Sequence, residues 1–365
     1  MRMALSSANI TSKYLKGDIL VLDDIQKINQ IDSEGALGVN AKVAELIRYS
    51  FNVTTNISAD SVTNIVVGGM GGSNQPAILA KNWLQSRLSL PIEIVPGYDI
   101  PASVTKKTLF IASSYSGNTE ESLSALEQAE EAGAQIVVMT SGGKLADIAA
   151  EKNYPVYMLT TGIQPRYALF NAVSAITHLL EDSGFVEGAV SELEAAGDNV
   201  QKAVENWLPE VETADNLAKQ IAQKAVGNSV VIYGGPLLKS AAYRWKITIN
   251  ENAKNVAWYN EWPEFNHNEF IGWSVAPENK PYFVVELQSN LEHPRVNKRF
   301  EISNDLLAGN MPTPYIVDVV GDTQIEQLLW AIKLGDFASL YLAVLNGVDP
   351  NPVHLVEELK VQLKK

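Results

Sequence analysis

The chain has 365 residues, 46% hydrophobic and 19% charged, which is ordinary for a folded protein and leaves room for two domains of roughly 100–200 residues. A net charge of −14 argues against a protein that binds the nucleic-acid backbone, although a local pocket can still take a small anion. The absence of cysteine excludes thiol catalysis, disulfides and cysteine metal sites. With no basic-plus-apolar leader and no apolar run of about 20 residues, we expect a cytoplasmic protein that binds neither nucleic acid nor membrane.

The first half of the chain alternates short apolar runs with helical patterns. One helix is expected over 36–49, ahead of the first apolar run. Runs of Val and Ile separated by helices indicate a parallel sheet covered on both faces. Strands are expected at 64–67, 92–95, 109–112, 136–139 and 156–159, and helices at 74–88, 119–132, 144–152 and 165–182.

A second alternating unit begins at Ser229 with Val-Val-Ile-Tyr-Gly-Gly, which echoes the Ile-Val-Val-Gly-Gly run at 65–69. Its expected strands are 229–235, 256–258, 282–287 and 314–318, and its expected helices are 236–255, 322–346 and 352–364. We predict an α/β protein in which each domain is a mostly parallel sheet flanked by helices, flavodoxin-like or Rossmann-like. The predicted parts are an N-terminal helical segment (1–50), a first domain (51–186), a helical linker (187–226) and a second domain (227–365).

The most informative stretch is Ser-Tyr-Ser-Gly-Asn-Thr-Glu-Glu at 114–121, where a predicted strand leads into a predicted helix. A helix N-terminus holds anions through its unpaired N–H groups, and Ser114, Ser116 and Thr119 add neutral donors. The natural guest is a phosphate monoester. The alternative is a capping loop with Thr119 as the N-cap.

The loop at 68–73, Gly-Gly-Met-Gly-Gly-Ser, also follows a predicted strand. It begins like a dinucleotide fingerprint, but Asn74 stands where that fingerprint needs Gly or Ala, and no Lys-Ser/Thr follows as in a nucleoside-triphosphate loop. We interpret the loop as a close approach to a compact ligand, with one hydrogen bond from Ser73; a tight turn feeding a helix is the alternative. Both loops together predict a cradle for a polar phosphorylated molecule.

Arg166 and Glu251 are candidates for charge stabilisation and proton transfer. Pro165 suits the first turn of a helix and places Arg166 at the rim of the strand ends, where it can stabilise an oxyanion; a solvated surface arginine is the alternative. Glu251 falls near the end of the helix expected over 236–255, where the dipole disfavours an acid, and sites often break such rules. The alternative is a solvent-facing Arg244–Glu251 surface.

His267 is the histidine that we single out for acid–base chemistry. It lies between two amides, which we expect to hold the imidazole in one tautomer. His178 sits in an apolar helical pattern and is expected in the core, whereas His293 and His354 are expected at the surface. No His-x-His or His-x₃-His pair accompanies the acids, so we expect no metal site.

The motifs, taken in order, resemble those of the bifunctional phosphoglucose/phosphomannose isomerases of archaea and bacteria. The Ser-Tyr-Ser-Gly-Asn-Thr motif alone marks the broader sugar isomerase (SIS) domain superfamily, and the Asn-His-Asn-Glu segment is the specific part. The chain departs from the family pattern at Asn74-Gln75-Pro76-Ala77, where the family has Ala-Ile-Gly-Gly, and this departure bears on sugar choice. The motifs lie at 69–73, 114–121, 142–145, 162–166, 250–251, 264–269, 272–273 and 349–353.

The resemblance implies two SIS domains and a homodimer with its active site at the interface. It implies reversible conversion of glucose 6-phosphate and mannose 6-phosphate to fructose 6-phosphate through a cis-enediol(ate), in glycolysis and gluconeogenesis, without metal or cofactor. By motif, the phosphate would be bound by Ser114, Ser116 and Thr119, and the sugar pocket would be lined by Gly72 and Ser73.

The resemblance also implies the catalytic roles. Glu251 would move the proton between C1 and C2, and Arg166 would stabilise the enediolate. His267, from the partner subunit, would help to open the ring. Lys360 would lie near the ring oxygen, with Lys364 and Lys365 as rival alignments.

Two other functions stay open at this stage. A non-catalytic SIS-type sensor of sugar phosphates needs no base at Glu251, but such sensors usually carry a nucleic-acid-binding domain, for which this acidic chain offers no candidate. Amino-sugar phosphate isomerisation coupled to glutamine hydrolysis usually relies on an N-terminal cysteine, which the chain lacks.

Overall fold

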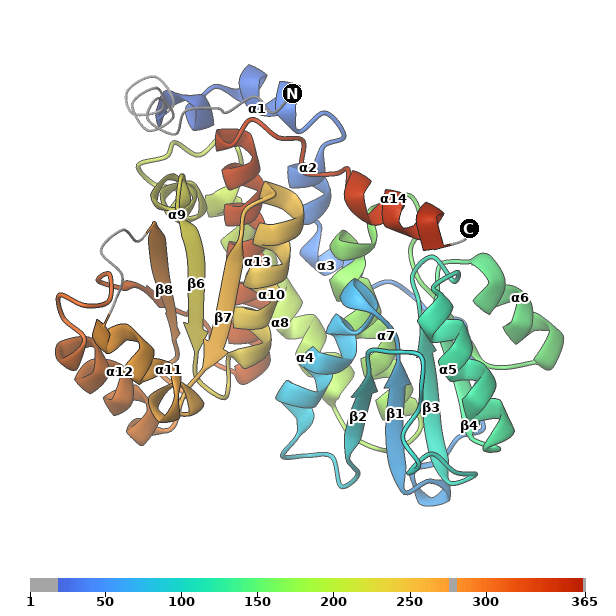
Figure 1. The fold of residues 1–365 in the computed structure, drawn as a ribbon. Helices are drawn as coiled ribbons and strands as arrows, with labels where there is room; N and C mark the ends of the chain where they lie inside the picture. Colours follow the sequence, from blue (N-terminus) through green and yellow to red (C-terminus); the bar gives the residue numbers. More distant parts are fainter. Residues whose placement is uncertain (1–18, 276–280, 364–365) are drawn as a thin grey trace. The chain divides into compact units, whose positions relative to one another are not determined.

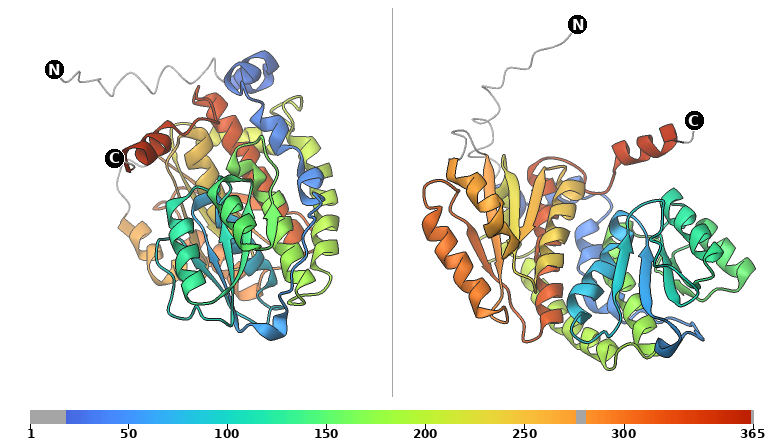
Figure 2. Two further views of the ribbon diagram at one scale, coloured as in Figure 1. Left: turned by 90° about the vertical axis from the view of Figure 1, so that its right-hand side faces the viewer. Right: turned by 60° about the horizontal axis from the view of Figure 1, so that its bottom comes forward.

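The structure is a computed structural model that describes residues 19–275 and 281–363 (Figure 1). The chain divides into two compact units. Of the described residues, the sheet A unit comprises 42–201 and 322–329, and the sheet B unit comprises 19–41, 202–275, 281–321 and 330–363. Each unit contains a parallel sheet with helices on both faces (Figure 2).

Sheet A has the strand order β2-β1-β3-β4-β5, and every pairing is parallel. The predicted parallel sheet is therefore confirmed. The central strand β3 is buried along its whole length, which explains why its sequence is a continuous apolar run. The strands are β1 (Asn64–Gly68), β2 (Ile92–Val95), β3 (Thr108–Ser113), β4 (Gln135–Thr140) and β5 (Val156–Met158).

Helices cover both faces of sheet A. On one face, Phe110 and Val138 of the strands pack with Leu126 and Leu145 of the helices in one apolar cluster. On the sheet, residues two apart share a face, so the alternate strand residues such as Ile111 face the other side, and they are equally buried. The helices are α3 (Val43–Ile47), α4 (Gln75–Leu84), α5 (Glu120–Glu131), α6 (Gly143–Lys152), α7 (Leu169–Asp182) and α8 (Ala189–Val204), with short 3₁₀ turns η3 (Gly71–Ser73) and η4 (Pro165–Ala168).

The prediction of one helix over 36–49 is wrong, because this segment forms two short helices, α2 (Ala36–Asn40) and α3. The Asp32 carboxylate accepts hydrogen bonds from the first N–H groups of α2. The side chain of Gln201, far along the chain, accepts the N–H groups of Val43 and Ala44 and so begins α3. A cap supplied from 157 or more residues away leaves no local signal in the sequence.

Sheet B has the strand order β7-β6-β8-β9, again parallel throughout. Its strands are β6 (Ser229–Gly234), β7 (Ala257–Glu261), β8 (Tyr282–Gln288) and β9 (Tyr315–Asp318). Its unit also contains α1 (Ile25–Ile31), α2, α9 (Leu217–Ala225), α10 (Lys239–Ala253), η6 (Glu264–His267), α11 (Glu269–Gly272), α12 (Pro294–Leu306), most of α13 (Gln324–Leu345), and α14 (His354–Leu363).

Within the described ranges, α13 is the one helix long and apolar enough to cross a membrane. Its apolar stretch is entirely buried in the protein. A core helix satisfies the same test of length and composition, so α13 is weak evidence for a membrane span.

Candidate functional site

The loops that follow β1, β3 and β5 meet at the carboxyl edge of sheet A. The turn η3, after β1, contacts η4, which follows β5. Ser113 Oγ, at the end of β3, donates to the carbonyl of Ser73 at 2.9 Å, and the Tyr115 N–H donates to Ser73 Oγ at 3.1 Å. The glycine-rich and hydroxyl-rich loops are therefore joined through Ser73, at the edge where parallel sheets bind ligands.

The hydroxyl-rich loop presents its donors ahead of α5. Ser114 and Thr119 share a hydrogen bond of 2.8 Å between their hydroxyls. Thr119 occupies the N-cap position of α5, but its side chain makes no capping bond, so the capping alternative does not explain its hydroxyl. Ser116 is exposed, and its hydroxyl accepts the Asn118 N–H at 3.3 Å. The arrangement leaves hydroxyl groups and the N-terminus of α5 together, as an anion requires.

Gly117 allows this loop to lie against the start of α6. Its φ is +66°, and a Cβ built on it would lie 1.8 Å from the carbonyl oxygen of Gly142. The loop is also bonded to α6, because the Leu145 N–H donates to the Gly117 carbonyl and the Lys144 N–H donates to Asn118 Oδ1. Only glycine fits at position 117, because the loop backbone lies directly against the backbone of Gly142.

Arg166 lies on η4 and is 4% exposed, so the alternative of a solvated surface arginine is wrong. Pro165 occupies the first turn, as predicted. The guanidinium stacks over the ring of Tyr167, with the carbon 4.9 Å from the ring centroid. A guanidinium is positively charged at any physiological pH. Arg166 therefore places a cation on η4, the turn that contacts η3.

Glu251 lies on the last turn of α10 and is half-buried. The helix face that carries Ser240, Arg244 and Thr248 is buried, so the solvent-facing alternative is wrong for this face. The reason is an ion pair: Arg244 Nε donates to Asp336 Oδ1 of α13 at 2.9 Å. Asp336 therefore fixes the helix that carries Glu251.

His267 ends η6 and is exposed. The expectation that its two neighbouring amides hold the ring is wrong. Asn266 donates to Ser303 Oγ at 2.9 Å and accepts from Arg299 at 3.0 Å, while Asn268 donates to Glu264 at 2.6 Å and accepts the Glu269 N–H. The amides fix the loop around His267, and the imidazole itself faces solvent.

Glu269 anchors the same loop to sheet B through residues that the sequence did not reveal. Its carboxylate accepts from the Tyr233 hydroxyl and, at 2.7 Å, from Asn260 Nδ2. The Trp273 indole donates to the Tyr233 oxygen at 3.0 Å. Burial, the Glu269 charge and the hydrogen bond to Glu269 raise the pKa of Tyr233, so its phenol remains a donor. Tyr233 and Asn260 lie 36 and 9 residues before Glu269, too far for a local pattern to pair them with it.

Within the sheet B unit, Glu251 and His267 lie at opposite edges of the sheet. The Ala257 N–H, at the start of β7, donates to Asn250 Oδ1 at 2.9 Å, so Glu251 sits at the amino edge. His267 follows the end of β7, where the Trp262 N–H bonds to the Gly234 carbonyl at the carboxyl edge. Since α10 rises about 1.5 Å per residue from its start at the carboxyl edge, Glu251 is roughly 18 Å along it.

Lys360 lies on α14 and is exposed. The rival residues Lys364 and Lys365 lie outside the described residues. His178, expected in the core, is only half-buried and contacts the ring of Phe51 edge-on. His293 and His354 are exposed, as predicted.

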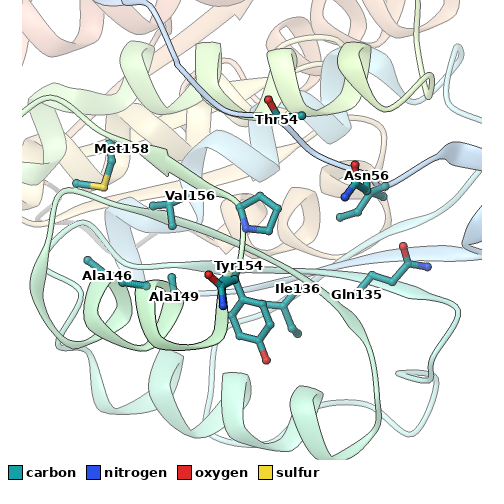
Figure 3. A pocket seen from close by; sticks show the side chains of 13 residues that line it. Thr54, Asn56, Gln135, Ile136, Ala146, Ala149, Tyr154, Val156 and Met158 are labelled. Carbon is teal, nitrogen blue, oxygen red and sulfur yellow. The ribbon is translucent and has the colours of Figure 1, made fainter.

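A hollow of about 740 Å³ lies elsewhere in the sheet A unit (Figure 3). It lies beside the amino ends of β4 and β5, and its described lining, which includes Thr54, Gln135, Tyr154 and Met158, carries no charged side chain. It therefore lacks the cation and the hydroxyl cradle of the carboxyl edge. Among the described residues, no group of three or more His, Asp or Glu side chains is arranged to hold a metal ion.

Comparisons with known proteins find a separate family match in each half of the chain. The SIS domain family matches residues 59–181, and the family described as the bacterial phospho-glucose isomerase C-terminal SIS domain matches residues 214–363. The bifunctional phosphoglucose/phosphomannose isomerase of Caldicellulosiruptor bescii is 34% identical over 90% of this chain and 98% of its own length. The enzyme of the same name from Aquifex aeolicus is 36% identical over 82% of this chain and 90% of its own.

Among solved structures, a glucose-6-phosphate isomerase-like protein from Thermus thermophilus aligns with 93% of this chain and 98% of its own, with a TM-score of 0.62. At 17% identity this likeness concerns the fold alone.

Proposed function

This chain belongs to the family of bifunctional phosphoglucose/phosphomannose isomerases, and from that premise we propose that it interconverts glucose 6-phosphate and mannose 6-phosphate with fructose 6-phosphate. The proposal rests on one observation. The Ser114 and Thr119 hydroxyls lie together at the N-terminus of α5, and the neighbouring turn η3 contacts η4, which carries the buried Arg166. Gly72, Ser73, Ser114, Ser116 and Thr119 bind the phosphorylated sugar.

The phosphate is held by uncharged donors. Hydroxyls and the helix N-terminus favour a dianion without a lysine or arginine clamp. Glucose and mannose phosphates differ only at C2. An anchored phosphate with a loosely held sugar chain lets the intermediate rotate about C2–C3, so that both aldoses are substrates.

Glu251 is the base. It takes the hydrogen from C2 of the open-chain aldose and returns it to C1, while the O2 proton moves to O1. Arg166 keeps its charge and stabilises the enediolate oxygens more than the ground state. A buried cation that is already in place costs no reorganisation when negative charge develops.

His267 acts from the partner subunit of a homodimer and helps to open the sugar ring. The support is topological, because Glu251 and His267 of one chain lie at opposite edges of sheet B. A hexose is too short to bridge them. Lys360, exposed on α14, acts near the ring oxygen. The enzyme works in the cytoplasm, in glycolysis and gluconeogenesis.

A coupled assay for fructose 6-phosphate tests the function. Purified protein given glucose 6-phosphate or mannose 6-phosphate is expected to form it from both. The Glu251→Gln variant is expected to lose turnover by at least about a thousandfold while it still binds the sugar phosphate, since only the base is removed. Glu127→Gln, on the exposed face of α5, is the matched control.

Tight binding of both substrates by the wild-type chain without turnover would instead support a sugar-phosphate sensor. Retained turnover in Glu251→Gln would remove that carboxylate from the mechanism.

A further inference from the structure

Tyr115 contacts the loops that follow three other strands of sheet A, although it lies in the loop after β3. Its N–H donates to Ser73 Oγ at 3.1 Å, in the loop after β1. Its carbonyl accepts from the Ser141 N–H at 3.0 Å and from Ser141 Oγ at 2.6 Å, in the loop after β4. Its phenol donates to the carbonyl of Ile163 at 3.0 Å, in the loop after β5.

The hydrogen bond of the Tyr115 phenol holds the segment that leads into the Arg166 turn. Ile163 lies three residues before Arg166, and Pro165 between them restricts the backbone. The turn is closed by the Tyr167 N–H, which donates to the Gln164 carbonyl at 2.9 Å. Fixing the Ile163 carbonyl therefore fixes where the Arg166 turn begins.

The phenol remains a donor at neutral pH. Burial is the largest effect on Tyr115 and raises its pKa, so it stays protonated. The Ile163 carbonyl has no proton to donate, so the phenol must be the donor in this hydrogen bond. Loss of the phenol proton would turn this attraction into a contact between two acceptors.

We propose that Tyr115 is a positioning residue that aligns Arg166 with the phosphate cradle, so that the cation meets the enediolate of an anchored substrate. This inference rests on the function proposed above. The backbone of Tyr115 fixes the cradle, whereas its phenol fixes the arginine turn. Removing the phenol alone is therefore expected to impair the chemical step and to spare phosphate binding.

Tyr115→Phe tests this separation. We expect kcat for glucose 6-phosphate to fall by about tenfold or more, because small misplacements of a stabilising group are costly, while KM stays within about twofold. The matched control is Tyr154→Phe, which removes a phenol that bonds Glu130 away from the site and is expected to keep wild-type kcat. Thermal unfolding of each variant verifies the fold.

A double-mutant cycle shows whether the phenol acts through the arginine. In an Arg166→Gln background, Tyr115→Phe is expected to change kcat by less than about twofold, since the group it positions is gone. A full tenfold loss in that background would overturn the proposal. An unchanged kcat in the single variant, or a loss confined to KM, would overturn it as well.

A fluorinated tyrosine placed at position 115 gives a reading that does not depend on deleting the side chain. Its phenol loses the proton at lower pH than tyrosine does. We expect kcat to fall as pH rises through that pKa, over a range in which the wild-type profile stays level; an unaltered profile contradicts the proposal. Absence of turnover in the wild-type chain would refute the proposed function instead, which separates the two failures.

Discussion

The hydroxyl of Thr119 bonds to another hydroxyl, that of Ser114, and leaves the N-terminus of α5 without a side-chain cap. A hydrogen bond between two neutral hydroxyls adds only about 0.5–1.5 kcal/mol of net stability, so exchanging it for a bond to a ligand oxygen costs little. Both groups are instead ready to rotate toward a guest with acceptor oxygens. This pairing is not that of a capping loop, and it is visible only when the partner of each hydroxyl is known.

Thr119→Val tests the phosphate contact at this scale. The substitution keeps the shape and deletes one donor to a charged group, worth about 1.5–3 kcal/mol, so KM for glucose 6-phosphate is expected to rise by roughly tenfold or more. Ser124→Ala, on the same helix, removes a hydroxyl that bonds the Tyr98 carbonyl and serves as the control. An unchanged KM in Thr119→Val would place the phosphate elsewhere.

At the level of elements, the apolar runs of the sequence predicted central strands such as β3 and β6 because these strands are buried almost throughout. The strand expected at 256–258 overlaps only the start of β7, whose remaining residues are exposed or half-buried. The sequence did not predict α12, whose described apolar contacts with the core are Val296 and Phe300, too few to make a helical stripe. Its N-cap is His293, a residue that seldom caps a helix. Helices that are fixed by distant polar contacts, as α3 is by Gln201, leave no local pattern.

Polar residues inside α13 are likewise held by polar partners that are distant in the sequence. Lys333 Nζ donates to Asn40 Oδ1 at 2.7 Å and lies 3.7 Å from Asp336 Oδ2, which also pairs with Arg244. Burial lowers the pKa of Lys333 to about 8, below the 10.5 of an unfolded chain, and the Arg244 charge acts in the same direction while Asp336 opposes it. A cation is therefore held where water is excluded, because Asp336 and Asn40 surround it.

The pH dependence of unfolding tests this placement. Between about pH 8 and 10 the unfolded chain binds a proton that the folded chain releases, so the free energy of unfolding is expected to rise with pH across this window. Above pH 10, ionisation of tyrosines in the unfolded chain acts in the opposite direction. Urea unfolding at pH 7.5, 8.5 and 9.5 measures the slope. Lys333→Met is expected to flatten it, and an equal slope in both proteins would contradict the assignment.

At the scale of the whole molecule, the order of strands and helices decides which residues of one chain can share a substrate. A helix that follows a parallel strand runs back to the amino edge, so Glu251 at the end of α10 is separated from His267, which follows β7. The motifs in the sequence named both residues but not the edge on which each lies. The strand and helix topology was needed to find this separation, and it is the ground for the proposal that the two residues act across subunits.

Mixing two inactive variants tests whether the residues act across subunits. Glu251→Gln and His267→Ala are each expected to be inactive as homodimers. After denaturation and refolding at equal concentrations, half of the dimers carry both variants, and each such dimer pairs one native Glu251 with the native His267 of the other chain. Activity is therefore expected to return to about a quarter of the wild-type value, because one of the two sites in a mixed dimer of C₂ symmetry is intact.

If both residues served the same chain, every site would lack one of them and mixing would restore nothing. Refolding each variant alone supplies the control, and refolded wild type fixes the scale.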